Sequence, residues 1–357
     1  MLSEYSNSTV FNTVRKDGNI YTMSVPAIFL FLFGVLCSVE SLDNGLALTP
    51  PMGWLSWLRF GCTIDCDSQP TECISENLIM RTADLMVSEG YLAAGYEYVT
   101  IDDCWLEKQR GPGGRLVADR KRFPSGIKAL AEYVHKKGLK FGIYEDYGSS
   151  TCAGYPGVEG HEKIDADTLA SWNIDYLKLD GCHTDIHTMS EAYPEFGRLL
   201  NITGRPILYA CSWPFFQEVN NIQPNYSEVG KNCNIWRNYY DISNSWESVL
   251  KTMSWFGNNQ NRIAPYTGPG HFSDPDMLVI GNSGLTVDQA QVQMAVWAIL
   301  ASPLMMSVDL ASIKPEFKAI LLNPDVIAIS QDKLGQQGLR VWKGSTFSKV
   351  NNLKFCI

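Results

Sequence analysis

At the centre of the sequence stands Ile174-Asp175-Tyr176-Leu177-Lys178-Leu179-Asp180-Gly181-Cys182. Its alternation predicts a β-strand with Tyr176, Lys178 and Asp180 on one face, because successive side chains of a strand point to opposite sides. Asp180 falls where the strand should end, and Gly181 frees the backbone to turn. A lysine two residues away on the same face favours the charged form of the Asp180 carboxyl group. The segment is therefore either a strand-end ion pair that closes a layer of the core, or part of a site in which Asp180 is a nucleophile or charge stabiliser.

Around this segment, strand-like and helical patterns alternate along the chain. Short runs of β-branched and aromatic residues predict strands at 52–57, 96–102, 140–144, 174–180, 206–210, 235–238, 263–266 and 304–308. Apolar residues at three- and four-residue steps predict helices at 75–90, 127–137, 166–172, 191–200, 246–256 and 287–300, with Gly138, Asn173 and Gly204 as helix exits. Eight strand–helix units favour a (β/α)8 TIM barrel of the α/β class over an open doubly wound sheet. No Gly-x-Gly-x-x-Gly follows these strands, so a dinucleotide site has no support.

The composition is that of an acidic, folded protein. Of its 357 residues, 45% are hydrophobic and 11% aromatic, which is enough for one large domain, or one large and one small. The formal net charge of −9 argues against nucleic acid or an anionic membrane surface as a partner. The five histidines are scattered, so we expect no metal site and no cofactor.

The N-terminal segment predicts entry into the secretory pathway. An uncharged apolar run at 25–36 is followed by small residues, which is typical of a signal peptide cut near Ser41. Residues 1–41 are then a signal peptide with an upstream extension, Met23 is an alternative start, and an uncleaved membrane anchor is the alternative reading. The mature form should have no membrane span and should be lysosomal or secreted.

The cysteines agree with an oxidising compartment. Of ten, Cys37 leaves with the signal peptide, Cys356 is left over, and the other eight form an even set. The absence of Cys-x-x-Cys disfavours structural zinc or a redox motif. Asn201-Ile202-Thr203 and Asn225-Tyr226-Ser227 are glycosylation acceptors expected on loops.

Acidic residues follow the predicted strands, where a barrel places its chemistry. They are Asp102, Asp103, Glu145, Asp146, Asp180, Asp241, Asp274 and Asp276. Strand-end acids can also cap the next helix, and that is the competing interpretation for Asp103, Asp146 and Asp274. Aromatic residues share this rim, namely Trp54, Trp57, Trp105, Tyr144, Trp213 and Trp236. Aromatic faces together with carboxylates suit a polyhydroxylated sugar ring.

Ordered motifs give the chain a resemblance to glycoside hydrolase family 27, the animal α-galactosidases and α-N-acetylgalactosaminidases. The resemblance runs from Leu42 to about Gln337. It is carried by Pro51-Met52-Gly53-Trp54, Ile101-Asp102-Asp103-Cys104-Trp105, Cys152-Ala153-Gly154-Tyr155-Pro156-Gly157, Lys178-Leu179-Asp180-Gly181-Cys182, Trp236-Arg237-Asn238, Asp274-Pro275-Asp276-Met277-Leu278 and Ile329-Ser330-Gln331-Asp332. It implies terminal α-galactosyl or α-N-acetylgalactosaminyl glycans as ligands and a homodimer as the assembly.

The resemblance implies that Asp180 is the nucleophile and Asp241 the general acid/base of a retaining glycosidase. Such a pair stands about 5–5.5 Å apart. The pKa of the acid must be raised by burial or by nearby anions.

The resemblance also implies sugar-binding roles and a disulfide pairing. The binding positions are Trp57, Asp102, Asp103, Tyr144, Lys178, Arg237 and Asp276. The two aspartates would accept bonds from the outer hydroxyls, Lys178 would donate, Trp57 would stack, and Arg237 would bridge hydroxyls on the other side. The implied disulfides are Cys62 with Cys104, Cys66 with Cys73, Cys152 with Cys182, and Cys211 with Cys233. The third would tether a loop behind Asp180.

Two features depart from the family pattern. After the fifth strand, galactosidase-like members carry Glu then Leu, and N-acetylgalactosaminidase-like members carry Ser then Ala; this chain has Ser212 and Phe215. Ser212 favours the acetamido sugar slightly, whereas Phe215 matches neither type. The family also continues into an antiparallel β domain, which is largely missing here. We therefore expect a catalytic barrel at 42–335 and a truncated or atypical start of the β domain at 336–357.

The leading hypothesis is a retaining exo-α-glycosidase acting on glycolipids, glycoproteins and oligosaccharides. A catalytically inactive, secreted galactose-binding relative is the first alternative, although a binder needs no acid/base pair. A barrel enzyme using its acids for Mg²⁺ is the second, and the Lys178 cation beside Asp180 disfavours it.

Overall fold

Eight short parallel strands form the centre of the chain. The computed structural model describes residues 15–16, 19–20, 44–343 and 353–356. The strands are β3 (Met52–Leu55), β4 (Tyr98–Ile101), β5 (Lys140–Asp146), β6 (Tyr176–Asp180), β7 (Leu208–Cys211), β8 (Ile235–Arg237), β9 (Phe272–Asp274) and β10 (Leu304–Met306). They pair in the order β10-β3-β4-β5-β6-β7-β8-β9, always in parallel. The predicted (β/α)8 barrel is confirmed.

The barrel closes between its last two strands through a single bridge rather than a ladder. Leu278, which follows β9, pairs in parallel with Met306 of β10. Its N–H donates to the carbonyl of Met305 at 2.8 Å, and its carbonyl accepts from the N–H of Ser307 at 3.2 Å. The chain that links β9 to this bridge contains Asp276, and the closure therefore holds a candidate site residue in place.

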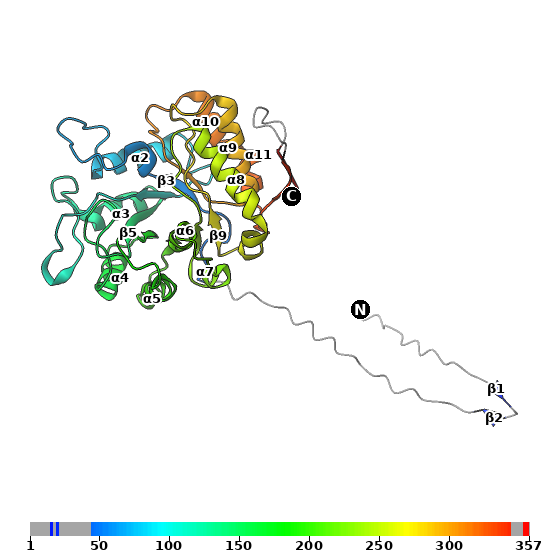
Figure 1. Cartoon of the computed structure of the whole chain (residues 1–357). Coiled ribbons are helices and arrows are strands. Elements are labelled where there is room, and N and C mark those ends of the chain that lie inside the picture. Colours follow the sequence, from blue (N-terminus) through cyan, green and yellow to red (C-terminus); the bar gives the residue numbers. More distant parts are fainter. Residues whose placement is uncertain (1–14, 17–18, 21–43, 344–352, 357) are drawn as a thin grey trace, which may run out of the picture. The chain divides into compact units, whose positions relative to one another are not determined.

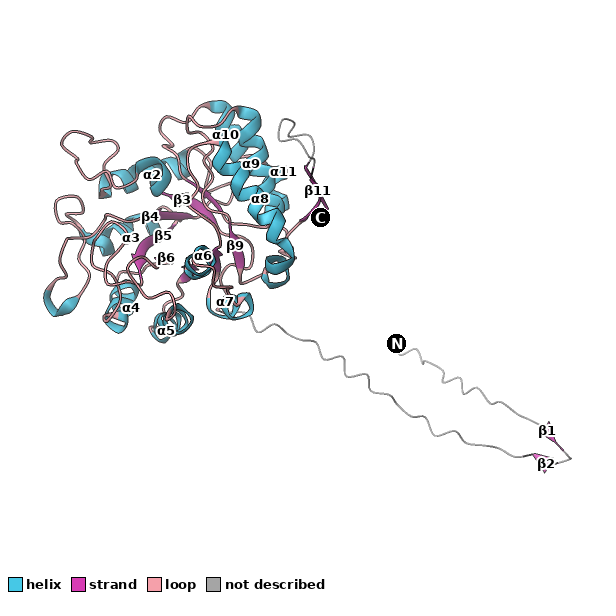
Figure 2. Cartoon of the chain, viewed as in Figure 1, coloured by secondary structure: helices cyan, strands magenta, loops and turns pink. Residues whose placement is uncertain are grey.

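Helices lie around the outside of the strands (Figures 1 and 2). The long ones are α2 (Glu76–Ser88), α3 (Gly126–Lys136), α4 (Glu162–Ser171), α5 (Met189–Ile202), α8 (Trp246–Ile263) and α9 (Val287–Ile299). The short ones are α1 (Trp57–Phe60), α6 (Trp213–Val219), α7 (Tyr226–Asn232), α10 (Pro315–Leu321) and α11 (Pro324–Ser330). The predicted exits are confirmed, because Gly138, Asn173 and Gly204 all have positive φ angles of 81°, 61° and 75°. In the described part of the chain, none of the helices is both long and apolar enough to cross a membrane.

The prediction of a strand at 263–266 is wrong. Ile263 ends α8, and Ala264–Tyr266 is a 3₁₀ turn. One side of α8 is buried along its whole length, at Val249, Met253, Phe256 and Ile263. The residues between Phe256 and Ile263 are mostly polar, so the helical pattern is not visible there in the sequence. The seventh strand is instead Phe272–Asp274, which is too short and too polar to give a strand signal.

Two further pairs of strands each form a two-stranded sheet of their own. β11 (Leu339–Lys343) pairs antiparallel with β12 (Leu353–Cys356), within the segment expected to begin a β domain. Near the N-terminus, β1 (Arg15–Lys16) pairs antiparallel with β2 (Asn19–Ile20). The predicted signal-peptide core at 25–36 and Ser41 lie outside the described residues.

The four implied disulfides are all present. They join Cys62 to Cys104, Cys66 to Cys73, Cys152 to Cys182 and Cys211 to Cys233. Both glycosylation acceptors are exposed; Asn225 ends the loop before α7, as expected, whereas Asn201 is a helical residue. Asn201 lies in the last turn of α5, and Asn225 is the N-cap of α7, where its side-chain oxygen accepts from the Glu228 N–H at 3.4 Å.

Candidate active site

The candidate residues gather at the carboxyl ends of the strands, as parallel strands of a barrel require. Asp102 and Asp103 follow β4, Tyr144 lies in β5, Lys178 and Asp180 lie in β6, Ser212 follows β7, Arg237 ends β8 and Asp276 follows β9. Trp57 begins α1 directly after β3 and is half-buried against the core. Lys178, Ser212, Arg237 and Asp276 line one narrow cavity together with Tyr176 and Asp274.

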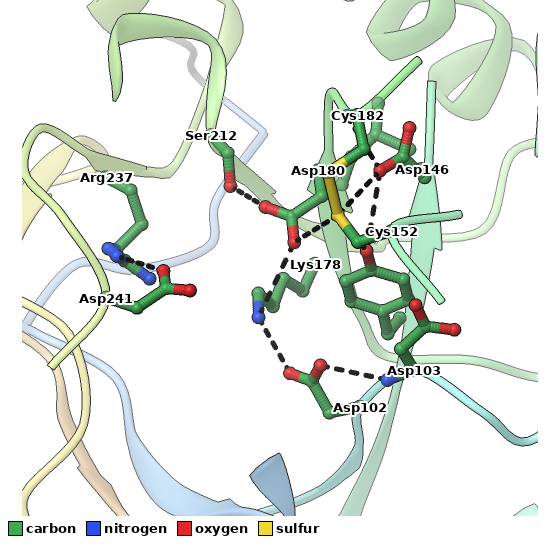
Figure 3. Close-up of polar contacts among 12 residues, drawn as sticks. Asp102, Asp103, Asp146, Cys152, Lys178, Asp180, Cys182, Ser212, Arg237 and Asp241 are labelled. Carbon is green, nitrogen blue, oxygen red and sulfur yellow. Dashed lines mark hydrogen bonds and ion pairs between the residues drawn. A yellow bond between two sulfur atoms is a disulfide. The ribbon is translucent and has the colours of Figure 1, made fainter. Parts of the chain in front are cut away.

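The neighbours of Asp180 differ from the simple pair that the sequence suggests. The Lys178 Nζ atom lies 3.9 Å from Asp180 Oδ2 but donates to Asp102 Oδ2 at 2.7 Å (Figure 3). Ser212, at the N-cap position of α6, makes no capping bond, and its hydroxyl instead donates to Asp180 Oδ1. Asp180 therefore has a cation on one oxygen and a hydroxyl donor on the other.

Burial and charge oppose each other at Lys178 and Asp102. Burial alone would lower the pKa of Lys178, but the carboxylates of Asp102, Asp180 and Asp276 outweigh it and the pKa is raised. The lysine is therefore a stable cation. Burial raises the pKa of Asp102 to about 6, against the opposing effect of Lys178. Burial, and next the charge of Asp180, raises the pKa of the Tyr144 phenol, which stays a neutral donor.

The turn after Asp180 is fixed from several sides. Asp146 Oδ2 accepts from the N–H of Cys182 at 2.9 Å, and Oδ1 accepts from the N–H of Gly148 at 2.8 Å. The Cys152–Cys182 disulfide lies beside Asp180, with Cys152 Sγ 3.9 Å from Asp180 Oδ2 (Figure 3). Gly181 is needed for space rather than for a special φ angle, because a Cβ there would lie 2.6 Å from Met189 Cε and 2.9 Å from the Tyr193 hydroxyl.

Asp146 is a member of the site that sequence reasoning treated as a candidate helix cap. It is fully buried, and burial, followed by the charge of Asp180, raises its pKa to about 8. Its pairing with Asp180 in the β5–β6 register is what brings the two carboxyl groups together. The signal was present in the sequence as two acids that each end a neighbouring strand.

The helix-cap interpretation is also wrong for Asp103 and Asp274. Asp103 Oδ2 accepts from the Ala153 N–H at 2.9 Å, and Oδ1 accepts from the Thr151 hydroxyl at 2.9 Å, so this carboxylate holds the loop on both sides of Cys152. Asp274 Oδ1 accepts from the N–H of Asp276 at 2.8 Å. The next helices begin too far along the chain for these acids to cap them, and the acids bind N–H groups of loops instead.

Most of the rim tryptophans are core residues. Trp54, Trp105, Trp213 and Trp236 are at most 1% exposed, so they offer no free face to a sugar. The indole N–H of Trp54 donates to the Val308 carbonyl at 2.8 Å. The expectation of a broad aromatic rim is therefore wrong for these four residues.

Asp241 lies on the other side of the site, on the loop between β8 and α8. Its Oδ1 accepts from Arg237 Nη2 at 2.9 Å (Figure 3). Arg237 Nη1 lies 3.2 Å from Asp276 Oδ2. Asp276 Oδ2 also accepts from the N–H of Ile242 at 2.8 Å, which fixes the loop just after Asp241. The Asp241 side chain is 70% exposed.

The expected rise in the pKa of Asp241 is wrong for this arrangement. The Arg237 guanidinium holds the pKa of that carboxyl group below its usual value. Asp241 is thus an anion until something displaces the guanidinium or covers the carboxylate.

One group of potential metal ligands lies close together among the described residues, namely Asp146, Cys152 and Cys182. The two sulfur atoms form a disulfide and are not thiolates, the form in which cysteine binds a metal. The group does not fit a metal ion.

Residues 49–332 match the family described as Alpha galactosidase A. The chain belongs to that family. It is 53% identical over 309 residues to the alpha-galactosidase A of Homo sapiens, covering 86% of this chain and 72% of the relative. It is 52% identical over 310 residues to the alpha-N-acetylgalactosaminidase of Gallus gallus, covering 87% of this chain and 76% of the relative.

Solved structures of the family have the same fold. The alpha-galactosidase of Saccharomyces cerevisiae with raffinose superposes with a TM-score of 0.76 at 29% identity, covering 86% of this chain and 69% of that one. Alpha-galactosidase I of Mortierella vinacea gives a TM-score of 0.73 at 31% identity, covering 85% and 78%. Relatives named for two sugars are almost equally similar to this family member, so overall identity does not choose between them.

The two residues that would read the 2-substituent of the sugar, Ser212 and Phe215, lie beside the catalytic candidates. Ser212 contacts Asp180, and Phe215 lies half-buried in α6 with its ring centroid 6.0 Å from the Arg237 guanidinium carbon. Phe215 is packed edge-to-face by Phe216 at 5.0 Å and Tyr240 at 5.7 Å. Its ring is therefore held in place at the edge of the site.

Proposed function

We propose that the protein is a retaining exo-α-glycosidase that removes terminal α-linked galactose or N-acetylgalactosamine from glycolipids, glycoproteins and oligosaccharides. The observation that carries the proposal is the environment of Asp180 at the end of β6. Its two oxygens are contacted by Lys178 and Ser212, and the turn behind it is locked by Asp146 and a disulfide. A nucleophile must be held in one place and remain an anion, and this arrangement supports both needs.

In the proposed reaction, an Asp180 oxygen attacks the anomeric carbon and forms an ester while the bond to the leaving oxygen breaks. The Asp241 carboxyl group gives its proton to that oxygen. A water molecule then attacks the anomeric carbon, Asp241 takes one of its protons, and the ester bond to Asp180 breaks. The two displacements together retain the anomeric configuration.

Asp241 has to be protonated when the first step begins. Its side chain is 70% exposed, and a bound substrate covers it. Loss of water raises the pKa of a carboxyl group, and a substrate hydroxyl that takes over the Arg237 N–H weakens the ion pair that lowers it. Substrate binding thereby converts an anion into the acid that the reaction requires.

The sugar-binding roles follow the same contacts. Asp102 and Asp103 accept bonds from outer hydroxyls, the Lys178 cation and Tyr144 hydroxyl donate, and Arg237 with Asp276 grips the opposite side of the ring. Trp57 stacks on the ring. Ser212 and Phe215 face the 2-substituent and choose between a hydroxyl and an acetamido group.

We also propose the processing and assembly that the sequence indicates. Residues 1–41 are removed as a signal peptide, 42–335 form the catalytic domain, and 336–357 begin an antiparallel β segment. Four disulfides and exposed Asn201 and Asn225 support passage through the secretory pathway. The lysosome or the outside of the cell is the destination, and the assembly is a homodimer.

Hydrolysis of chromogenic α-galactoside and α-N-acetylgalactosaminide from about pH 4 to 7 tests the proposal, because a general acid gives a limb to the pH profile. Asp180→Asn should abolish turnover of both substrates while leaving sugar binding intact. If the folded wild-type protein binds galactose but cleaves neither substrate, the enzyme hypothesis is refuted and the galactose-binding hypothesis takes its place. The preferred sugar shows what Ser212 and Phe215 select.

A further inference from the structure

The Cys152–Cys182 disulfide directly borders the proposed catalytic site. Cys152 Sγ accepts from the Tyr144 hydroxyl at 3.2 Å, and it lies 3.4 Å from Asp146 Oδ2 and 3.9 Å from Asp180 Oδ2 (Figure 3). Tyr144 and Asp180 are two of the residues proposed to contact the sugar. A group attached to this sulfur would therefore lie among the residues that hold the substrate.

Of the four described disulfides, this is the one in which neither cysteine is buried. Cys152 is exposed and Cys182 is half-buried. Each of the other three has at least one cysteine that is at most 1% exposed, and these buried cysteines are Cys73, Cys104, Cys211 and Cys233. Small solutes can therefore contact both halves of the Cys152–Cys182 bond, but only one half or neither half of the others.

Thiol–disulfide exchange depends on access to the attacked sulfur and on how readily the other sulfur leaves as a thiolate. Burial in apolar surroundings raises the pKa of a thiol, so a buried cysteine is a poor leaving group. Attack on exposed Cys62 would release a thiolate at Cys104, which is fully buried. Attack on Cys152 releases it at Cys182, which is in contact with solvent. Exchange should therefore be faster at the disulfide beside Asp180.

The two loops that this disulfide joins have other bonds that hold them. The residues on both sides of Cys152 donate to the Asp103 carboxylate, each at 2.9 Å. The N–H of Cys182 donates to Asp146 Oδ2, also at 2.9 Å. Opening the disulfide leaves these hydrogen bonds in place, so exchange can change the site without unfolding of the barrel.

We propose that the Cys152–Cys182 disulfide is a thiol-exchange site through which small-molecule thiols reversibly inactivate the enzyme. The thiolate of the small molecule attacks Cys152 Sγ, a new S–S bond forms between the two sulfur atoms, and the Cys152–Cys182 bond breaks. Cys182 leaves as a thiolate and takes a proton from water. The reverse attack by Cys182 on Cys152 expels the small thiol and restores the enzyme, so the cycle consumes no oxidant. The loss of activity rests on the glycosidase function proposed above, whereas the exchange itself does not.

Peptide mapping by mass spectrometry of the folded, fully oxidised protein tests the site. The protein is incubated at about pH 7 with 2-mercaptoethanol, and free thiols are trapped with iodoacetamide before digestion. The adduct should appear on Cys152 and the trapped thiol on Cys182, while the other three disulfides stay closed and serve as internal controls. Hydrolysis of the preferred chromogenic substrate should fall in proportion to the adduct and should return when 2-mercaptoethanol is removed without trapping.

Galactose should protect the disulfide, because a bound sugar occupies the space around Tyr144 and Asp180. At about ten times its dissociation constant, galactose leaves about one tenth of the protein free. Formation of the adduct should therefore slow by about 10-fold. Glucose at the same concentration, whose 4-hydroxyl has the opposite configuration, is the control and should slow it less. If the acetamido sugar is preferred, N-acetylgalactosamine takes the place of galactose.

Opening of another disulfide before Cys152–Cys182, or opening of none, would overturn the proposal. So would a Cys152 adduct that leaves hydrolysis at its full rate, or one that forms equally fast with and without the bound sugar. A protein that hydrolyses neither substrate before any thiol is added refutes the glycosidase function instead. The peptide map then still decides whether the exchange site exists, so the two failures are distinguished.

Discussion

Replacing Asp146 by asparagine should remove a large part of the decrease in the free energy of unfolding that occurs as the pH rises. The carboxyl group is fully buried behind Asp180, and its pKa is raised to about 8. In the unfolded chain an aspartate ionises near pH 3.9. Between these two values the folded protein keeps the proton and the unfolded chain releases it, so rising pH favours unfolding.

The magnitude follows from linkage. While the folded state binds one proton more than the unfolded state, the free energy of unfolding falls by about 1.4 kcal/mol per pH unit. From pH 5 to pH 7 the contribution of Asp146 amounts to roughly 3 kcal/mol. Its stabilising effect is complete below about pH 4 and is lost as the pH rises through the folded-state value of about 8.

Urea unfolding at pH 5, 6 and 7, with the disulfides kept oxidised, measures this slope. Asp146→Asn also loses an acceptor for the N–H of Gly148 or Cys182, at a cost of about 1–3 kcal/mol. That cost lowers stability about equally at each pH, so it shifts the curve without changing its slope. Asp185→Asn, at an exposed acid that binds the nearby His187 N–H, is the matched control and should keep the wild-type slope.

If the free energy of unfolding falls with pH at the same slope in Asp146→Asn and in the wild type, the reasoning is refuted, because Asp146 would then have the same charge in the folded and unfolded states. A smaller slope in Asp185→Asn would refute it too, since burial would not be the cause.

Three further changes probe other parts of the structure. Glu145 is fully buried, neither of its oxygens has a hydrogen-bond partner among the described residues, and burial raises its pKa well above the usual value. In the same urea titration, the stability of Glu145→Gln relative to the wild type should therefore be higher at pH 7 than at pH 5. An unchanged pH dependence would contradict this. Lys178→Met leaves Asp102 buried without its cation and should cost about 3–5 kcal/mol where Asp102 is ionised. The cost should fall toward lower pH, because burial raises the pKa of Asp102 and loss of the lysine raises it further; a cost independent of pH would contradict the ion pair as its cause. Phe215→Ala opens space at the 2-substituent and should raise kcat/KM for the acetamido sugar relative to galactose by about 10-fold, a typical effect of pocket volume; equal changes for both sugars would remove Phe215 from specificity.

The sequence predicted the long elements and the rim of acids, because these depend on local pattern. The alternation around Lys178 and Asp180 predicts a strand from local sequence alone, without knowledge of its tertiary contacts. The same local reasoning failed at 263–266, where polar residues on the exposed side of α8 interrupt the visible period and an apolar end looks like a strand. Helices of seven residues or fewer, such as α6 and α7, span two turns at most and leave no periodicity to read.

Within the site, the residue types were predictable and their partners were not. Lys178 was expected to bind its neighbour Asp180, yet its closer carboxylate is Asp102, 76 residues away in the chain. Register between strands, not spacing along one strand, decides which charges meet. Burial is equally non-local, and for that reason the raised pKa of Asp146 and the core position of Trp105 could not be read from composition or spacing.

The two proposed catalytic carboxylates lie in opposite surroundings, and the difference suits their roles. Asp180 must keep one position and one charge, and it is surrounded by a cation, a hydroxyl donor and a turn that Asp146, Gly181 and a disulfide hold from behind. Asp241 must release and regain a proton in every cycle, and it lies 70% exposed with Arg237 as its ion-pair partner. An acid whose protein contacts all stay in place does not respond to substrate, whereas one whose water and guanidinium contacts are replaced on binding changes its pKa when the leaving oxygen arrives. The arrangement therefore predicts that the acidic form of Asp241 belongs to the substrate complex, so the alkaline limb of the kcat profile should lie at higher pH than that of kcat/KM, which reports the free enzyme.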